Sequence, residues 1–429
     1  TLDINFDILK FTTMKTHNFS PESLMMSYGY KPELSEGAVK CPIFQTSTFE
    51  YKTAEEAKAF FEIAYGLRDK GPREELGLIY SRINNPNLEI LENRLCLWDK
   101  ADDCAMFESG MAAISTIMLE FLKPGDLLVH GNPLYGGTDH FIEHFLTSIG
   151  IEVINVHADE SIENVTKMIE DSGKADKLAM IYFETPANPT NDIMDIEAYS
   201  GIAKRFSTSE RKVYLAVDNT YMGPLWQHPL QLGADMVVYS ATKYIGGHSD
   251  LIAGAVLGSK DVMIRVKTLR TFLGNMLGPH TAWLLLRSLE TLKIRMDQQT
   301  KNAQKVAEFL NKHPKVEHVN YLGLLKKGTP EYTIYKKQCE APGAMISVYI
   351  KGGEKEAFKC LNTLKLFKLA VSLGSTESLA QHPKTMTHAG VNTEHRERMQ
   401  ITDNLIRLSI GVENSNDIIW DLDQALATI

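Results

Sequence analysis

The fold of this chain is decided by residues 234–247, Ala-Asp-Met-Val-Val-Tyr-Ser-Ala-Thr-Lys-Tyr-Ile-Gly-Gly. The first six residues are mostly apolar and rich in β-branched side chains, which is typical of a buried strand. Lys243 comes just after this strand, next to the hydroxyls of Ser240 and Thr242 and before a Gly-Gly pair. Because ligands of open α/β sheets bind at the carboxyl ends of strands, we expect Lys243 to lie in a binding site. The alternative is an ordinary surface lysine.

A second buried-strand pattern, residues 213–217, ends in Asp218-Asn219-Thr220. A lysine can form a Schiff base with an aldehyde cofactor, and nearby hydroxyls can bind its phosphate. A carboxylate beside a pyridine nitrogen keeps that nitrogen protonated, so that the ring can accept electrons. Lys243 and Asp218 together therefore predict pyridoxal phosphate (PLP) as the cofactor. Taken alone, Asp218 could equally cap the loop that follows its strand.

The pattern from residue 88 to about 290 alternates between helix and strand, which predicts a mostly parallel, doubly wound sheet in a large α/β domain. The expected helices are 87–99, 109–122, 160–172 and 196–206. The expected strands are 103–107, 126–130, 152–156, 178–183, 213–217, 235–239 and 251–257.

The two ends of the chain differ from this central part. Residues 1–87 are weakly periodic and are expected to form an arm that contributes to a neighbouring subunit's site, with a helix at 53–64 that starts in a Thr/Glu capping box. Residues 65–78 are charged and glycine-containing, as in a loop. Residues 291–429 are expected to form a smaller α+β domain. A long helical pattern spans 281–312, strands are expected near 316–320, 344–350 and 405–411, and helices near 354–364 and 414–427.

The composition excludes several classes of function. The chain has 429 residues and a net charge of −9, which argues against binding to nucleic acids or to anionic membranes. No apolar run approaches the roughly 20 residues of a membrane span, and no secretory signal is expected. The five cysteines are scattered and form no CxxC pair, so we expect reduced thiols, no zinc site and a cytoplasmic protein.

Four further stretches carry side chains suited to a cofactor or substrate. Tyr80 and Arg82 precede a Pro-containing turn and could reach a phosphate, or they belong to a solvated loop. Gly110 and Met111 open a helix, whose N-terminus attracts anions, although Ser109 there could simply be an N-cap. Tyr135, in a Gly-rich loop, could stack on a ring or act as an acid, or merely pack. Arg407 interrupts an apolar strand and needs an anion, either a substrate carboxylate or a structural partner.

With these residues in view, the chain resembles the Cys/Met-metabolism PLP-dependent enzymes from about residue 40 to its C-terminus. This family includes methionine γ-lyase, cystathionine γ-lyase, cystathionine γ-synthase and the O-acetylhomoserine sulfhydrylases. The resemblance implies the fold type I architecture of aspartate aminotransferase. It rests on six motifs in family order: Tyr80-Ser-Arg-Ile-Asn-Asn-Pro, Ser109-Gly-Met-Ala-Ala, Glu184-Thr-Pro-Ala-Asn-Pro, Asp218-Asn-Thr, Ser240-Ala-Thr-Lys-Tyr and Arg407-Leu-Ser.

The resemblance also implies a role for each matching residue and a homotetramer built from active-site dimers. Lys243 is expected to hold PLP and move protons, and Tyr135 to stack on the ring and protonate the leaving group. The other expected contacts are Asp218 at the ring nitrogen; Gly110, Met111, Ser240 and Thr242 at the phosphate; Tyr80 and Arg82 at the neighbouring subunit's phosphate; Asn188 near the 3-hydroxyl; and Ser372 and Arg407 at the substrate carboxylate.

Members of the family differ in substrate, and a few positions bear on that choice. Cystathionine-using relatives often carry glutamate where this chain has Val371, and Gln381-His382-Pro383 also resembles methionine γ-lyase. The resemblance therefore implies γ-elimination of L-methionine or a related thioether to 2-oxobutanoate, ammonia and a thiol. Gly137 and Gly274-Asn275 depart from the methionine γ-lyase pattern. Cystathionine cleavage or synthesis and γ-replacement on an activated homoserine stay open, as does a PLP-binding protein without turnover.

Overall fold

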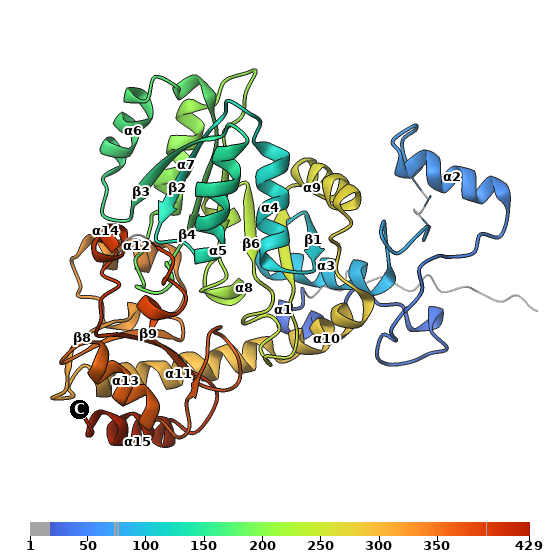
Figure 1. Cartoon of the computed structure of the whole chain (residues 1–429). Helices are drawn as coiled ribbons and strands as arrows, with labels where there is room; N and C mark the ends of the chain where they lie inside the picture. The colour runs from blue at the N-terminus through green and yellow to red at the C-terminus, as the bar shows by residue number, and fades with distance from the viewer. Residues whose placement is uncertain (1–17, 73, 75–76, 392) are drawn as a thin grey trace, which may run out of the picture.

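The computed structural model describes residues 18–429 except 73, 75, 76 and 392, and its centre is a seven-stranded sheet (Figure 1). The strand order is β1-β7-β6-β5-β4-β2-β3. Neighbours from β6 to β3 run parallel, as predicted, whereas β7 is antiparallel to both β1 and β6. The strands are β1 Asp103–Phe107, β2 Leu127–Asn132, β3 Glu152–His157, β4 Leu178–Glu184, β5 Tyr214–Asp218, β6 Met236–Tyr239 and β7 Gly254–Gly258. Strand β7 can run antiparallel because no crossover helix separates it from β6.

Helices cover both faces of this sheet because side chains alternate between them along each strand. Ala105 and Phe107 pack on the face with α4 Gly110–Phe121 and α9 Lys260–Leu273, whereas Cys104 and Met106 face the core with α3 Pro86–Asp99. Helices α6 Ile162–Asp171 and α7 Ile196–Phe206 cover the latter face farther along, over the apolar side chains of β3, β4 and β5. The short elements here are α5 Gly136–His140, η2 Phe141–Leu146, η3 Ala175–Lys177, α8 Gly223–Trp226 and η4 Pro229–Leu232.

A second sheet of five strands lies in the C-terminal part, in the order β10-β11-β12-β9-β8. Its central strand β12, Leu405–Ser409, is buried along its whole length and carries Arg407. The other strands are β8 Val316–Asn320, β9 Met345–Ile350, β10 Lys368–Leu369 and β11 Leu379–Gln381. The helices and short turns are α12 Pro330–Gln338, α13 Glu354–Thr363, α14 Thr393–Arg398, α15 Ser415–Leu426, η5 Leu322–Leu324 and η6 Pro383–Thr385.

The helical pattern predicted for residues 281–312 is two helices in the structure. Helix α10, Pro279–Leu289, packs against α3, and α11, Leu292–Leu310, packs against the second sheet and α15. The helical hydrogen bonding is interrupted at Thr291, although the buried apolar side chains of both helices belong to the same hydrophobic core. Helix α9 and strands β10 and β11 were not predicted. The division into domains near residue 290 stays a prediction.

The N-terminal segment contains α1 Pro21–Leu24, η1 Pro32–Leu34 and α2 Ala54–Ala64. Only part of this segment stands apart: α2 projects away from the two sheets, whereas α1 packs against α3 and Met25 is fully buried (Figure 1). The Thr53 hydroxyl accepts a hydrogen bond from the Glu56 N–H at 3.1 Å, as a capping box requires, but the Glu56 carboxylate reaches back to the N–H of Lys52 instead of Thr53. In the charged loop that follows, Arg68 pairs with both Glu62 and Glu74. Three residues of that predicted loop lie outside the described residues.

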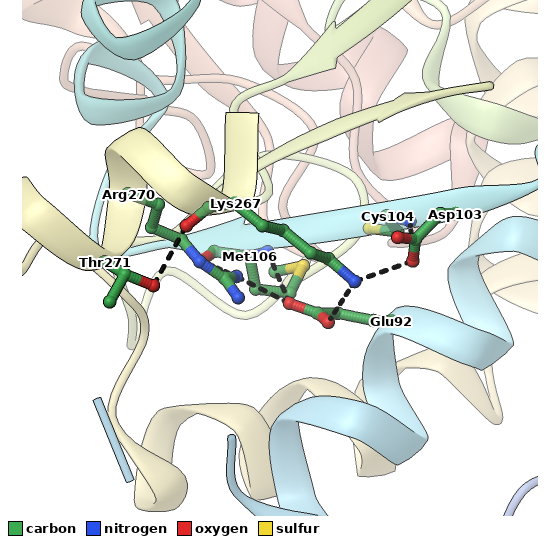
Figure 2. A network of polar contacts seen from close by, with 7 residues as sticks. All are labelled: Glu92, Asp103, Cys104, Met106, Lys267, Arg270 and Thr271. Carbon is green, nitrogen blue, oxygen red and sulfur yellow. Dashed lines mark hydrogen bonds and ion pairs between the residues drawn. The ribbon is translucent and has the colours of Figure 1, made fainter. Parts of the chain in front are cut away.

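A buried ionic cluster joins α3, β1 and α9 (Figure 2). Glu92 accepts from Arg270 at 2.6 Å and from the Met106 N–H at 2.9 Å, while Lys267 bonds Asp103 at 2.7 Å. Burial alone would raise the pKa of Glu92, but Lys267 and Arg270 outweigh burial and lower it. The carbonyl of the next residue, Thr271, accepts from Arg82, so the end of α9 positions the predicted phosphate-binding segment.

Two global features bear on the sequence predictions. Within the described residues, no helix is both long and apolar enough to cross a membrane. All five cysteines are free thiols, and no group of three or more His, Cys, Asp or Glu side chains in the described part of the chain is gathered as a metal site.

Candidate active site

Lys243 is held in place by the turn that follows β6. The Lys243 N–H donates to Ser240 O at 3.1 Å, and the Gly247 N–H donates back to Lys243 O at 2.7 Å. Gly247 has φ +68°, and a Cβ there would overlap the guanidinium of Arg295. Arg295 in turn donates to Tyr244 O at 2.8 Å. The second glycine of the pair is therefore required both for the left-handed turn and for this close approach.

The Lys243 amine lies in a setting that favours its neutral form. Its Nζ donates to the Ser372 hydroxyl at 2.9 Å. Burial and the nearby positive charge of Arg407 lower the pKa of Lys243 from 10.5 to about 8. About a tenth of such amines are neutral near pH 7, compared with fewer than one in a thousand at the ordinary pKa. The side chain is thus suited to act as a nucleophile and as a base.

Asp218 ends β5, the strand next to β6, and is buried. Its carboxylate accepts from the Thr220 N–H at 2.9 Å and from the Tyr182 hydroxyl at 3.2 Å, both of which are neutral donors. Burial raises the pKa of Asp218. A buried carboxylate with neutral donors would gain a favourable partner from a protonated ring nitrogen.

A cavity of about 240 Å³ brings eight of the predicted site residues together. They come from the ends of β4, β5 and β6, the start of α4 and the loop after β2, which meet at one edge of the sheet. The eight are Gly110, Met111, Tyr135, Asn188, Asp218, Ser240, Thr242 and Lys243; the cavity is also lined by Ser109, Ile114, Glu184, Thr220, Tyr221, Ile252 and Leu373.

The N-terminus of α4 forms one wall of the cavity. Ser109 caps the helix by accepting from the Ala112 N–H at 3.0 Å. A Cβ on Gly110 would lie 2.9 Å from the Ser240 side chain, so only glycine allows these two segments to approach so closely. The first N–H groups of a helix lack intrahelical partners and attract anions. This wall therefore suits a phosphate group.

Thr242 is less available for a phosphate than the sequence suggested. Its hydroxyl donates to Ala253 O at 3.2 Å and accepts from the Ala253 N–H at 3.0 Å. Its hydrogen would have to leave the Ala253 carbonyl to bind a phosphate oxygen. The neighbouring Thr220 uses its hydroxyl to accept from the Ser240 N–H at 2.7 Å, so it positions the Ser240 segment.

Arg407 reaches the site from the second sheet and is fully buried. Its Nη1 donates to Asn188 Oδ1 at 3.0 Å, and its Nη2 donates to the carbonyl of Ser372. Its Nε has no hydrogen-bond partner among the described residues. Burial lowers the pKa of Arg407 to about 10, so the guanidinium is still charged at neutral pH. A buried cation with an unsatisfied donor suits an anionic ligand such as an amino-acid carboxylate.

Ser372 connects Lys243 to Arg407 although it adopts an unfavourable backbone conformation. Its φ of +84° lies in the left-handed region, which is uncommon for a residue with a side chain. Its hydroxyl binds Lys243 and its carbonyl binds Arg407. Non-glycine residues in this region occur preferentially at functional sites, where the surroundings hold them in place.

Five predicted site residues do not line the cavity in this chain. Ser372 and Arg407 are linked to it by hydrogen bonds to Lys243 and Asn188, whereas Tyr80, Arg82 and Val371 lie apart from it. Tyr80 is 41% exposed, and Arg82 bonds Thr271 of its own chain. Val371 is 51% exposed. Their predicted contacts with a neighbouring subunit's cofactor or with the substrate stay predictions.

Glu184 and Thr220 line the cavity, although the sequence analysis did not name them as site residues. Both lie within motifs that the sequence analysis quoted, Glu184-Thr-Pro-Ala-Asn-Pro and Asp218-Asn-Thr. Each ends or follows a strand at the carboxyl edge of the sheet, and that position was the available signal. Tyr221 and Leu373, which also line the cavity, offered no comparable signal.

The residues of this cavity fit pyridoxal phosphate. A lysine with a lowered pKa can bond the aldehyde, the Asp218 carboxylate can pair with the ring nitrogen, and the N-terminus of α4 can receive the phosphate. The unsatisfied Nε of Arg407 adds a place for the carboxylate of an amino acid.

Comparison with known proteins agrees with this fit. The model of the Cys/Met metabolism PLP-dependent enzymes matches residues 22–427. An L-methionine γ-lyase of Fusobacterium nucleatum subsp. polymorphum is 43% identical over 92% of this chain and 94% of its own length. A cystathionine γ-lyase of Bacillus subtilis is 38% identical over 95% of this chain and 99% of its own length.

A solved structure, metB from Corynebacterium glutamicum, is 35% identical with a TM-score of 0.83 and covers 96% of this chain and 98% of its own. These matches bear out both the fold class and the resemblance inferred from the motifs. The chain therefore belongs to the family of Cys/Met-metabolism PLP-dependent enzymes, and pyridoxal phosphate is its cofactor.

Proposed function

We propose that this enzyme is a carbon–sulfur lyase that carries out γ-elimination on L-methionine or a related thioether amino acid. The products are 2-oxobutanoate, ammonia and a thiol. The observation that carries the proposal is that the Lys243 amine and the Asp218 carboxylate line one cavity, while the Arg407 guanidinium bonds Asn188 on the wall of that cavity. Relatives named L-methionine γ-lyase, 43% identical to this chain, support the thioether substrate.

Bound pyridoxal phosphate supplies an aldehyde for the substrate amine and a protonated ring that accepts the electrons released at the α-carbon. Arg407 holds the substrate carboxylate, and this fixes the α-carbon relative to Lys243. The neutral Nζ of Lys243 takes the α-proton, and the Ser372 hydroxyl, 2.9 Å from Nζ, orients the amine. Asp218 keeps the proton on the ring nitrogen.

The carbon–sulfur bond breaks after a second proton has left the β-carbon. The electron pair of the bond leaves with sulfur, and the Tyr135 hydroxyl gives the thiolate its proton. Tyr135 is on the wall of the cavity and is 46% exposed in the single chain, so it can meet the outer end of a substrate. Water then releases the remaining carbon skeleton as 2-oxobutanoate and ammonia.

The test is a product assay on methionine, cystathionine and O-acetylhomoserine, each with and without an added thiol. We expect methionine alone to yield 2-oxobutanoate and a volatile thiol in stoichiometric amounts. Release of 2-oxobutanoate from neither thioether would contradict the proposal, and γ-replacement on O-acetylhomoserine would become the better assignment. A PLP-binding protein without turnover would release nothing from any of the three.

Val371 is the residue on which the preference for methionine over cystathionine rests. Cystathionine ends in a second charged amino-acid group, which an apolar side chain leaves without a partner, whereas methionine ends in a methyl group. We expect Val371→Glu to shift the ratio of kcat/KM toward cystathionine by about ten- to a hundredfold, since one charge-assisted contact contributes roughly 1.5–3 kcal/mol.

The matched control for this prediction is Val371→Gln, which has the length of glutamate without its charge. It should shift the ratio much less than Val371→Glu does. Equal shifts for the two variants would show that size, not charge, governs the choice. A wild-type enzyme that cleaves cystathionine at least as well as methionine would contradict the assignment of Val371.

We also propose a site shared between subunits of a homotetramer in the cytoplasm. Residues 1–87 would form the arm, 88–290 the cofactor domain and 291–429 the smaller domain. Tyr80 and Arg82 lie outside the cavity of their own chain, and helix α2, which precedes them, projects away from the two sheets in Figure 1. Both observations support an arm that serves a neighbour. The five free thiols are compatible with a reducing compartment.

Mixing two inactive variants tests the shared site. Arg82→Ala subunits and Lys243→Ala subunits should each have little activity, and their mixture should recover it. At equal mixing about a quarter of the sites would contain neither lesion, because half of the dimers are mixed and each has one intact site. Arg82→Ala mixed with itself is the control. No recovery after proven subunit exchange would count against a shared site.

A further inference from the structure

Glu184 lies in the active-site cavity, and the proposed mechanism assigns it no role. It ends β4 directly beside Asp218, with which it is paired in the sheet register, and it is buried. Its two carboxylate oxygens accept from two different backbone N–H groups. Oε2 accepts from Tyr135 at 3.1 Å, and Oε1 accepts from Asn188 at 3.0 Å.

The two N–H groups belong to separate loops that both carry functional side chains. Tyr135 follows β2 and begins α5, whereas Asn188 follows β4 and accepts from Arg407 through its side-chain oxygen. The Tyr135 loop is also packed tightly, because a Cβ on Gly136 would lie 2.8 Å from the carbonyl of Thr387. One carboxyl group therefore ties the proposed acid of the reaction to the residue that contacts the substrate-binding arginine.

The position of this carboxyl group is electrostatically unfavourable. Burial and the neighbouring Asp218 raise the pKa of Glu184 to about 8, and only the two N–H groups and Arg407 act in the other direction. A neutral glutamine would fill the same space without a second acid beside Asp218. The feature that glutamine cannot reproduce is acceptance at both ends, because its amide offers one acceptor and one donor.

We propose that Glu184 is a positioning residue that holds Tyr135 and Asn188 in place through their backbone N–H groups. The role of the held Tyr135 as an acid rests on the proposed function. Removing one acceptor frees one of the two loops, so that the Tyr135 hydroxyl and the Arg407–Asn188 pair no longer keep a fixed relative position. The chemical step then slows, while binding of the cofactor phosphate at α4 is unaffected.

The experiment measures hydrogen–deuterium exchange at the amides of Tyr135 and Asn188 together with steady-state kinetics. In Glu184→Gln, exchange of at least one of the two amides should be about tenfold faster than in wild type, in both the apoprotein and the PLP-loaded enzyme. With methionine, kcat should fall by about ten- to a hundredfold with little change in KM. Glu143→Gln is the control, because Glu143 lies beyond α5 and contacts His130 instead of either loop amide.

The exchange rates of the two amides decide whether Glu184 is a positioning residue. Unchanged exchange at both amides would overturn the proposal, whether or not kcat falls. If Glu184→Gln does not fold, Glu184→Asp takes its place, since its shorter side chain keeps the carboxyl group but cannot reach both N–H groups. Faster exchange in an enzyme whose wild type releases no 2-oxobutanoate would leave Glu184 as a positioning residue and overturn the proposed function alone.

Discussion

Replacing Lys243 with alanine is expected to lower the release of 2-oxobutanoate from methionine by about a thousandfold or more. The variant loses the amine predicted to bond the cofactor and to move the α-proton, and no other basic side chain among the described residues lines the cavity. The purified variant should also lack the yellow colour of the wild-type enzyme. Borohydride treatment of wild type should attach the cofactor irreversibly to the peptide that contains Lys243.

The control for this prediction is Lys260→Ala, which removes an exposed lysine at the start of α9. It should keep wild-type activity and colour. Thermal unfolding of the two apoproteins separates loss of function from loss of fold. Attachment of the cofactor to any other lysine after borohydride treatment would contradict the assignment.

Replacing Arg407 with lysine should lower kcat/KM for methionine by about a hundredfold or more, mainly through KM. The guanidinium can hold a carboxylate with two parallel hydrogen bonds, and a lysine ammonium is a point charge that cannot do so. Loss of one charge-assisted bond costs about 1.5–3 kcal/mol. The variant also loses donors to Asn188 Oδ1 and to the carbonyl of Ser372.

Inhibition by substrate analogues distinguishes carboxylate binding from a structural role of Arg407. Wild type should bind methionine more tightly than methionine amide, which lacks the carboxylate charge, and Arg407→Lys should bind the two almost equally. Arg265→Lys is the control, because Arg265 forms a partly exposed ion pair with Glu120 and should have a small effect. An equal loss of affinity for both analogues would assign Arg407 to packing instead.

The order of the motifs along the chain was sufficient to predict the cofactor and the fold class. Strands 213–217 and 235–239 are short and apolar and end in Asp218 and Lys243, so sequence alone indicated that these residues meet at one sheet edge. That inference works because parallel neighbouring strands end on the same side. The sequence-based prediction fails where an element lacks a clear period, as for β10, β11 and α9, or where one continuous helical pattern is interrupted in the structure, as at Thr291.

Local sequence indicates which residue types the chemistry needs, and the three residues predicted on that basis, Lys243, Asp218 and Tyr135, line one cavity. The sequence could not give the protonation state of those groups, because a pKa depends on burial and on charged side chains that belong to distant segments of the chain. Lys243 owes its lowered pKa partly to Arg407, which lies 164 positions later in the chain and enters from the second sheet. Folding also places separate loops within hydrogen-bond distance of one another. Only for that reason does Glu184 accept from two backbone N–H groups, and only for that reason does the strained residue Ser372 bond Lys243.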